Sequence, residues 1–106
     1  MSLTNFRTFE RAVEFHRACK GLRLPAYLKN QLLRAASSTA LNLAEGSGRE
    51  YRKDRKRFYN IALGSHRECQ AVLILSDGVS AELTQLADHL GACLYKLNRS
   101  NQDKPS

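Results

Sequence analysis

Long hydrophobic runs, a secretion signal and strand-like patterns are all missing from this 106-residue chain. No apolar segment approaches the ~20 residues that a transmembrane helix needs, which excludes a membrane-spanning protein. Residues Met1 to Arg11 lack the charged-then-apolar layout of a secretion signal, and we therefore expect a cytoplasmic protein. Apolar and polar residues nowhere alternate over the length of a strand, so the pattern predicts an all-α fold.

Cysteine is scarce, and its three copies, Cys19, Cys69 and Cys93, show no paired spacing. All three lie on or beside predicted apolar stripes, where cysteine acts as a small buried hydrophobic residue. Proteins of the reducing cytosol rarely keep disulfides. We therefore expect no disulfide bond.

Histidine and cysteine occur twice at metal-ligand spacing: His89 and Cys93 are four residues apart, and His66 and Cys69 are three apart. This spacing permits ligation on a helix. However, the helical pattern places His89 off the stripe that holds Cys93, and the chain lacks the carboxylate and histidine clusters of di-metal bundles. We expect no metal and no other cofactor.

Catalytic constellations are missing as well. The chain has no Ser, His and Asp set and no nucleophile turn, and Gly46-Ser47-Gly48 is too short for a P-loop. His16 lies in the middle of an apolar stripe, which is more typical of a hydrogen-bonded interior or interface histidine than of a catalyst. We expect a non-enzymatic protein with no catalytic residue.

Four helical segments account for most of the chain, at about residues 5–20, 26–45, 51–75 and 80–98. Because the connections are short, sequential helices should lie antiparallel, which predicts an up-down-up-down four-helix bundle. We expect residues 1–98 to form this single domain and the polar residues 99–106 to form a flexible tail.

Apolar stripes on these segments predict the core. The first helix should bury Phe6, Phe9, Ala12, Val13, His16 and Cys19, with Phe15 at the edge of the stripe. The third should bury Phe58, Ile61, Ala62, Ser65, Cys69, Val72 and Ser76. The fourth should bury Val79, Leu83, Leu86, Ala87, Leu90, Cys93, Leu94 and Leu97.

The second helix carries an alanine ridge, Ala36, Ala40 and Ala44, beside its own apolar stripe. Together they make about half of the helix circumference apolar, which is more than one bundle core needs. We therefore expect the alanine ridge to be an oligomer interface. Gly46 and Gly48 should then end the helix, because glycine accepts the positive φ of a C-terminal cap.

A net charge of +7, from 17 basic and 10 acidic residues, distinguishes the chain. Between Arg49 and Arg57 there are six cations against two anions, and most of these cations should face away from the core. A solvated helix face has a similar pattern, but clustering and the excess of Arg over Lys favour nucleic acid. The expected nucleic-acid contacts are Arg49, Arg52, Lys53, Arg55, Lys56, Arg57 and Arg67.

Three aromatic residues, Tyr51, Phe58 and Tyr59, lie beside this basic run. Aromatic side chains in such a position can stack on unpaired bases. Phe58 is expected in the core, whereas Tyr51 and Tyr59 are open to either use.

Three further charged residues, Arg34, Glu45 and Glu68, have two interpretations. They either form ion pairs and hydrogen bonds across the bundle edges or bind a ligand. If any of them is buried it should be paired, because an unpaired buried charge is strongly destabilising.

Part of this sequence resembles the signature of a known family. The pattern joins Asn42-Leu43-Ala44-Glu45-Gly46, then Gly48 and Arg49, to a later Gly64-Ser65-x-x-Glu68, and it also includes Gln31, Arg34, Ala35, Ala36, Phe58, Ile61 and Ala62. It is similar to the four-helix-bundle proteins encoded in intervening sequences of bacterial large-subunit rRNA genes. Their relatives include the accessory variability determinant proteins of diversity-generating retroelements. The resemblance covers about residues 24–97.

The resemblance implies an antiparallel bundle that assembles into a ring-like homo-oligomer, commonly a pentamer, with a basic surface. Together with the charge, it favours a non-enzymatic accessory protein that binds RNA, DNA or both. A retroelement reverse transcriptase with its template RNA is one candidate partner. The alternative is a protein-interaction scaffold with no direct nucleic-acid role.

Overall fold

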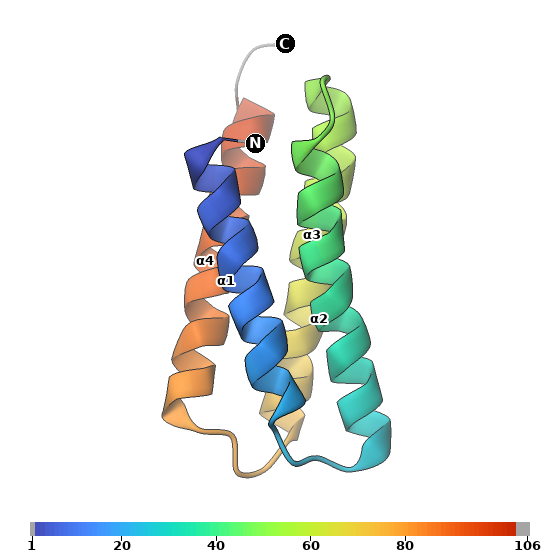
Figure 1. The fold of residues 1–106 in the computed structure, drawn as a ribbon, viewed down its shortest axis with the longest axis vertical. Coiled ribbons are helices and arrows are strands. Elements are labelled where there is room, and N and C mark those ends of the chain that lie inside the picture. Colours follow the sequence, from blue (N-terminus) through green and yellow to red (C-terminus); the bar gives the residue numbers. More distant parts are fainter. Residues whose placement is uncertain (1, 104–106) are drawn as a thin grey trace.

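The computed structural model describes residues 2–103, with their side chains to residue 100, and consists of four helices. These are α1 (Leu3–Lys20), α2 (Ala26–Ser47), α3 (Arg52–Leu75) and α4 (Ala81–Asp103), as Figure 1 shows. Residues 2–103 contain no strand, so the all-α prediction is confirmed. Over the same residues, no helix has both the length and the apolar character needed to cross a membrane.

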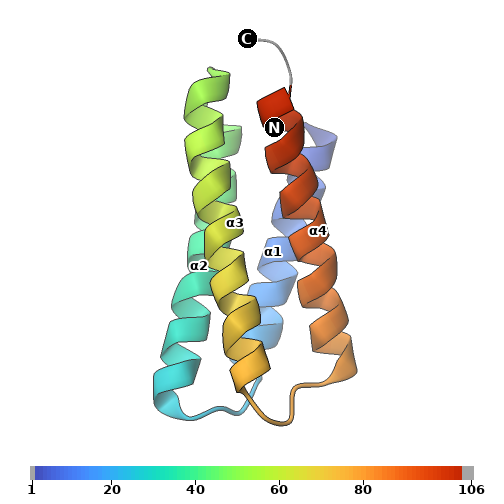
Figure 2. The ribbon, with the colours of Figure 1, turned by 180° about the vertical axis from the view of Figure 1, so that it is seen from behind.

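The helices run along one long axis, and the bundle has two distinct ends (Figures 1 and 2). One end, which we call the junction end, holds the start of α1, the α2–α3 connection at residues 48–51 and the end of α4. The other, the loop end, holds the connections at residues 21–25 and 76–80. Each helix packs against two neighbours, since α2 and α4 both contact α1 and α3. The core lies between all four.

The helix boundaries lie within two residues of the predicted ones, except at the end of α4. This helix continues to Asp103, so residues 99–103 of the predicted tail are helical. Residues 104–106 of that tail lie outside the described residues. Serine side chains fix two helix starts: Ser2 Oγ accepts from the Asn5 N–H at 3.2 Å, and Ser80 Oγ accepts from the Leu83 N–H at 3.1 Å.

The buried face of α1 is rotated relative to the predicted stripe. The residues that it buries are Thr8, Ala12, Phe15 and Cys19. Phe6 is exposed, and the other predicted core residues, Phe9, Val13 and His16, are half-buried. Thr8 can enter the core because its hydroxyl donates to the Thr4 carbonyl at 3.0 Å. The prediction that Phe15 lies at the edge was wrong.

The buried face of α3 is rotated as well. It comprises Tyr59, Ala62, His66, Cys69, Val72 and Leu73. The predicted residues Phe58, Ser65 and Ser76 are half-buried, and Ile61 is exposed. Tyr59 and His66 replace them in the core, where the Tyr59 hydroxyl and His66 Nε2 have hydrogen-bond partners. On α4 the prediction was better, since Leu83, Ala87, Leu90 and Leu94 are buried.

Gly46 does not end α2, because the helix continues through it to Ser47 and Gly48 has φ −85°. The prediction of a positive-φ cap was therefore wrong. Gly46 instead allows a close contact: a Cβ added there would lie 2.7 Å from Tyr59 Cε1 and 2.9 Å from Cδ1. Among the described residues only Gly78, in the connection between α3 and α4, has a positive φ, of 74°.

Candidate nucleic-acid interface

Tyr59 connects all four helices at the junction end. Its ring packs on Gly46 of α2. Its hydroxyl accepts a hydrogen bond from Asn5 Nδ2 of α1 at 3.1 Å and lies 3.3 Å from Ser47 Oγ of α2. Asn98 Nδ2 of α4 donates to the Tyr59 carbonyl at 2.9 Å. The start of α3 is therefore held in one position relative to the other three helices.

Arg55 fixes the short α2–α3 connection. Its Nη1 donates to the carbonyls of Glu50, at 2.6 Å, and Arg49, at 3.2 Å. Arg49 Nη2 in turn lies 3.7 Å from Glu45 Oε2, and its guanidinium carbon lies 4.8 Å from the centre of the Phe58 ring. Contacts of this kind combine ion pairing with cation–π attraction. These contacts hold the connection in one conformation, and most of the cations follow directly after it on α3.

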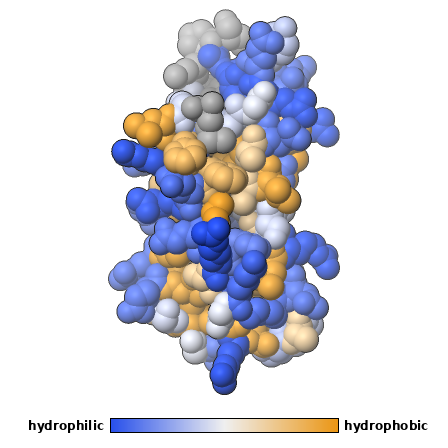
Figure 3. Space-filling model, viewed as in Figure 1, coloured by the Kyte–Doolittle hydropathy of each residue, from blue (hydrophilic) through white to orange (hydrophobic). Residues whose placement is uncertain are grey.

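Six of the seven predicted cations lie together at the junction end. Arg49, Lys53, Lys56 and Arg57 are exposed, and Arg52 and Arg55 are half-buried. The seventh, Arg67, is also exposed but lies about 16 Å beyond Lys56, at 1.5 Å per helical residue. Figure 3 shows hydrophilic residues covering the end of α2 and the start of α3 beside this connection. The structure therefore separates Arg67 from the basic cluster.

A pocket of about 570 Å³ opens at the junction end between α1, α3 and α4. Arg52, Arg55 and Lys96 contribute three cations to its lining, and no described residue that lines it is Asp or Glu. Lys96 was absent from the predicted contacts, because nothing in the sequence connects the end of α4 with the start of α3. The remaining lining residues are Ser2, Thr4, Asn5, Thr8, Tyr59, Cys93, Leu97 and Ser100.

The three aromatic residues of the basic run have different environments. Tyr59 is 1% exposed and is therefore not available for stacking on bases. Phe58 is half-buried, with the guanidinium carbons of Arg49 and Arg57 at 4.8 and 5.8 Å from its ring centre. Tyr51 is 68% exposed just before α3. Tyr51 is thus the residue of the three that can meet a base.

The alanine ridge is largely used inside the chain. Ala36 is 1% exposed and belongs to the core, so its methyl group is not offered to a second subunit. Ala40 and Ala44 are half-buried, and Ala40 packs against the core. The charged residues Arg34, Glu45 and Glu68 are all exposed, so none of them is a buried charge.

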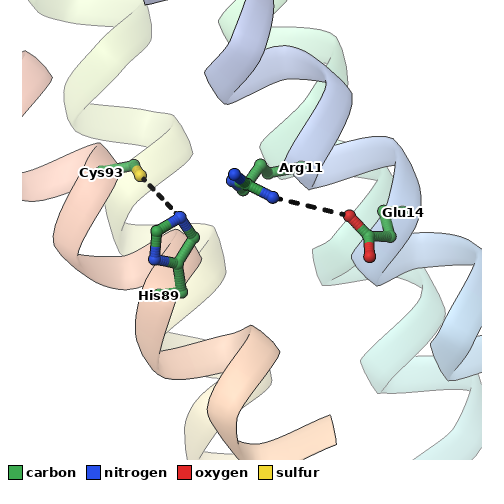
Figure 4. Close-up of polar contacts among 4 residues, drawn as sticks. All are labelled: Arg11, Glu14, His89 and Cys93. Carbon is green, nitrogen blue, oxygen red and sulfur yellow. Dashed lines mark hydrogen bonds and ion pairs between the residues drawn. The ribbon is translucent and has the colours of Figure 1, made fainter. Parts of the chain in front are cut away.

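His89 and Cys93 come together on α4, although the helical pattern placed His89 away from Cys93. Cys93 Sγ lies 3.7 Å from His89 Nε2, as Figure 4 shows beside the 3.9 Å pair of Arg11 and Glu14 on α1. A metal site needs further ligands, and within the described residues no three His, Cys, Asp or Glu side chains are grouped to hold a metal ion.

Cys19 and Cys69 lie fully inside the core as free thiols. Burial raises the pKa of each to about 12, so both stay protonated and unreactive at neutral pH. His16 is half-buried, and its Nε2 lies 3.1 Å from Ser37 Oγ of α2. It is therefore a hydrogen-bonded residue between α1 and α2.

His66 is the main buried polar residue that the sequence did not reveal. Its Nε2–H donates to the Ala87 carbonyl at 2.7 Å, and the Phe15 ring packs edge-on at 5.1 Å between centroids. Its Nδ1 has no hydrogen-bond partner among the described residues, and burial lowers its pKa. The spacing Tyr59, Ala62, His66, Cys69 follows the helical period, so counting Tyr and His as apolar would have found this face.

The match to a known family includes residues of all four helices. The sequence model of the 23S rRNA-intervening sequence protein family matches residues 7–100, from the second turn of α1 to near the end of α4. No curated protein and no solved structure matches the chain. The match extends over the whole segment that carried the predicted resemblance and confirms it. The chain belongs to the family of 23S rRNA-intervening sequence proteins.

Proposed function

We propose that this protein is a non-enzymatic, homo-oligomeric accessory protein that binds the phosphate backbone of RNA or DNA at its junction end. The observation that carries the proposal is the gathering of six cations and Lys96 around one buried support, Tyr59. Cations held close together neutralise neighbouring phosphates and release their counterions, which drives binding without sequence readout.

The surroundings of these cations support backbone contact rather than base recognition. Lysine and arginine side chains on a helix reach phosphates readily. Reading base edges needs further donors, acceptors or stacking platforms, and Tyr51 is the exposed aromatic residue of the basic run. We therefore expect a small sequence preference and similar affinities for RNA and single-stranded DNA.

Assembly is the second part of the proposal. Exposed apolar residues on α2 and α3, Leu41 at 68% and Ile61 at 42% exposure, support a contact beyond the single chain. Gly64 of α3 supports it too, because a Cβ added there would meet no atom within 4 Å. Glycine inside an exposed helix costs about 0.5–1 kcal/mol relative to alanine, and close approach of a second subunit would account for it.

We propose that this face joins up-down-up-down bundles into a ring, with a pentamer as the expected size. Light scattering should give a mass several times the 11.9 kDa of one chain. The Gly64→Lys variant should shift that mass downward while keeping its helicity, because a long charged side chain would block the contact. A parent that scatters as a single chain would contradict this part.

Binding is tested with fluorescently labelled RNA and DNA oligonucleotides at increasing salt. Each phosphate contact adds about −0.7 to the slope of log affinity against log salt for single strands. We expect a slope of about −2 or steeper, from three or more contacts. If the parent binds neither nucleic acid at low salt, the protein-interaction scaffold is the better function. A role beside a reverse transcriptase would then be tested by direct binding of the two proteins.

A further inference from the structure

The outer side of α3 and α4 carries a groove that is separate from the junction-end pocket. This α3–α4 groove has a volume of about 340 Å³ and lies toward the loop end, where α3 ends and α4 begins. Figure 2 looks onto this side of the bundle, with α3 and α4 in front of α1 and α2. The residues that line the groove are Gln70, Leu73, Ile74, Thr84, Ala87 and Asp88.

Apolar side chains are unusually exposed beside this groove. Ile74 is 84% exposed and Leu75 is 73% exposed, more than any other large apolar residue of the described chain. Leu73 and Ala87, which are buried, form apolar surface between the two helices. A single exposed apolar residue is common, but neighbouring ones at the edge of a groove are typical of an interaction site.

The groove lies in the acidic part of a basic chain. Residues 68–95 contain four carboxylates and no Lys or Arg, so all 17 basic residues of the chain lie outside this segment. The segment forms the end of α3, the connection and the larger part of α4. The nearest basic residue along α3 is Arg67, a turn from Gln70 toward the junction end. The four carboxylates, all exposed, are Glu68, Asp77, Glu82 and Asp88.

A polar bridge marks the end of the groove that faces the junction end. Gln70 Nε2 of α3 donates to Asp88 Oδ1 of α4 at 3.4 Å, one turn beyond Ile74 and Thr84. A carboxylate that accepts one hydrogen bond has room for further donors. Asp88 can therefore receive a cation from a bound partner while it keeps its contact with Gln70.

We propose that the α3–α4 groove binds the basic, amphipathic helix of a partner protein. Grooves between helices receive the apolar face of such a helix, which presents large side chains at i, i+3, i+4 and i+7. Ile74 and Leu73 would contact these side chains, and Asp88 would pair with a Lys or Arg beside them. Negative charge around the groove disfavours an acidic helix and nucleic acid. This site is independent of the proposed RNA contacts, which lie at the junction end.

The first test uses a labelled peptide of about 18 leucine and lysine residues, with leucines at helical spacing. A scrambled peptide of the same composition is the control. The parent should bind the ordered peptide at least about fivefold more tightly, and Ile74→Gln should remove this difference, because one buried interface anchor has an effect of this size. Ile61→Gln is the matched variant, since it changes an exposed isoleucine of α3 outside the groove. It should bind like the parent.

A second pair of variants tests the charge. Asp88→Asn, which keeps an acceptor for Gln70, should weaken binding of the ordered peptide about twofold to fivefold and reduce its salt dependence. Glu45→Gln removes an exposed carboxylate at the junction end and should leave peptide binding unchanged. Equal affinities for the two peptides, or equal losses in the two isoleucine variants, would overturn the proposal.

Light scattering and RNA binding separate this site from the other surfaces. Ile74→Gln should keep the mass and the RNA affinity of the parent. If its mass falls, the groove is a contact between copies of this chain, and the proposal of a separate partner is wrong. Peptide binding by a parent that does not bind RNA would support the groove and contradict the proposed function. RNA binding without peptide binding would do the reverse.

Discussion

The pockets at the two ends of the bundle are lined by described residues of opposite charge. The junction-end pocket, of about 570 Å³, is lined by Arg52, Arg55 and Lys96 and by no described carboxylate. A loop-end pocket of about 450 Å³ is lined by Glu14 and Glu82 and by no described Lys or Arg. The described residues thus place basic side chains around one pocket and acidic side chains around the other. The net charge of +7 alone does not show this separation.

Each end of the bundle uses one cation to hold a helix connection. At the loop end, Lys29 Nζ donates to the Lys20 carbonyl at 2.7 Å and to the Leu22 carbonyl, so it holds the α1–α2 connection. At the junction end, Arg55 holds the α2–α3 connection in the same manner. The junction end has exposed cations beyond this one, including Lys53 and Lys56. Arg17, Lys20 and Arg23 are exposed at and near the loop end, so the two ends differ in how many exposed cations they group together and not in whether they have any.

The largest expected effect comes from breaking the Gly46–Tyr59 contact that supports the junction end. Gly46→Ala should lower the free energy of unfolding, because overpacking costs about 1–3 kcal/mol and the helix gains only about 0.5–1 kcal/mol from alanine. Gly91→Ala is the matched control. Its added Cβ would lie 3.3 Å from Nε2 of Gln70, a flexible side chain, so it should be neutral or slightly stabilising.

Denaturant titration of both variants checks this prediction. A Gly46→Ala variant as stable as the Gly91→Ala variant would show that the junction end tolerates a looser fit and that Tyr59 is not its rigid support.

A smaller effect is expected from lowering the pH, which should reduce the free energy of unfolding through His66 in the middle of the bundle. His66 has a folded pKa below its ordinary 6.5 because of burial. The unfolded chain therefore takes up a proton near pH 6.5 that the folded chain refuses, so stability is complete above that pH and falls below it. The slope is at most about 1.4 kcal/mol per pH unit.

Denaturation between pH 5 and 7.5 measures this slope. His66→Gln, which keeps a donor for the Ala87 carbonyl, should flatten it, whereas His16→Gln should change it less because His16 is only half-buried. A parent whose stability does not change over this range would contradict the role assigned to His66.

The smallest expected effect concerns two solvent-exposed ion pairs, one at the junction end and one on α1. Glu45→Gln and Glu14→Gln each break a solvent-exposed pair, Arg49–Glu45 at 3.7 Å and Arg11–Glu14 at 3.9 Å, so each should cost at most about 0.5 kcal/mol. Only Glu45→Gln should strengthen RNA binding, by roughly twofold, because it removes a negative charge beside the basic cluster. Equal affinities of the two variants for RNA would show that the ends do not differ.

The sequence predicted the four helices and the basic run because these depend on local patterns. Helix boundaries and short connections are visible as breaks in the apolar pattern, and charge clustering is visible in any continuous segment. The buried residues that it did not predict have polar atoms whose hydrogen-bond partners lie far away in the sequence. Tyr59 was left open between core and base stacking, and His66 was left out of the predicted stripe, because Asn5 and Ala87, which bond to them, are distant in sequence.

Two further features were beyond local patterns. Gly46 had a plausible local explanation as a helix cap, and only the position of Tyr59 shows that it allows close packing. Lys96 joins the basic end from α4, whose end lies beside the start of α3 only in the folded bundle. Long-range neighbours, rather than composition, therefore decide which charges act together.

Binding of nucleic acid at the junction end is tested most directly by two matched triple variants. One changes Arg52, Lys53 and Lys56 to Glu, and the other changes Arg17, Lys20 and Arg23 to Glu at and near the loop end, so both alter the net charge equally. We expect the first variant to bind RNA at least about 100-fold more weakly at moderate salt. The second variant, whose changes lie beyond the ~8 Å screening length, should lose only a few-fold in affinity. Circular dichroism should show both folded. Equal losses of RNA affinity in the two variants would contradict binding at the junction end, because binding would then depend on the overall charge and not on one end of the bundle.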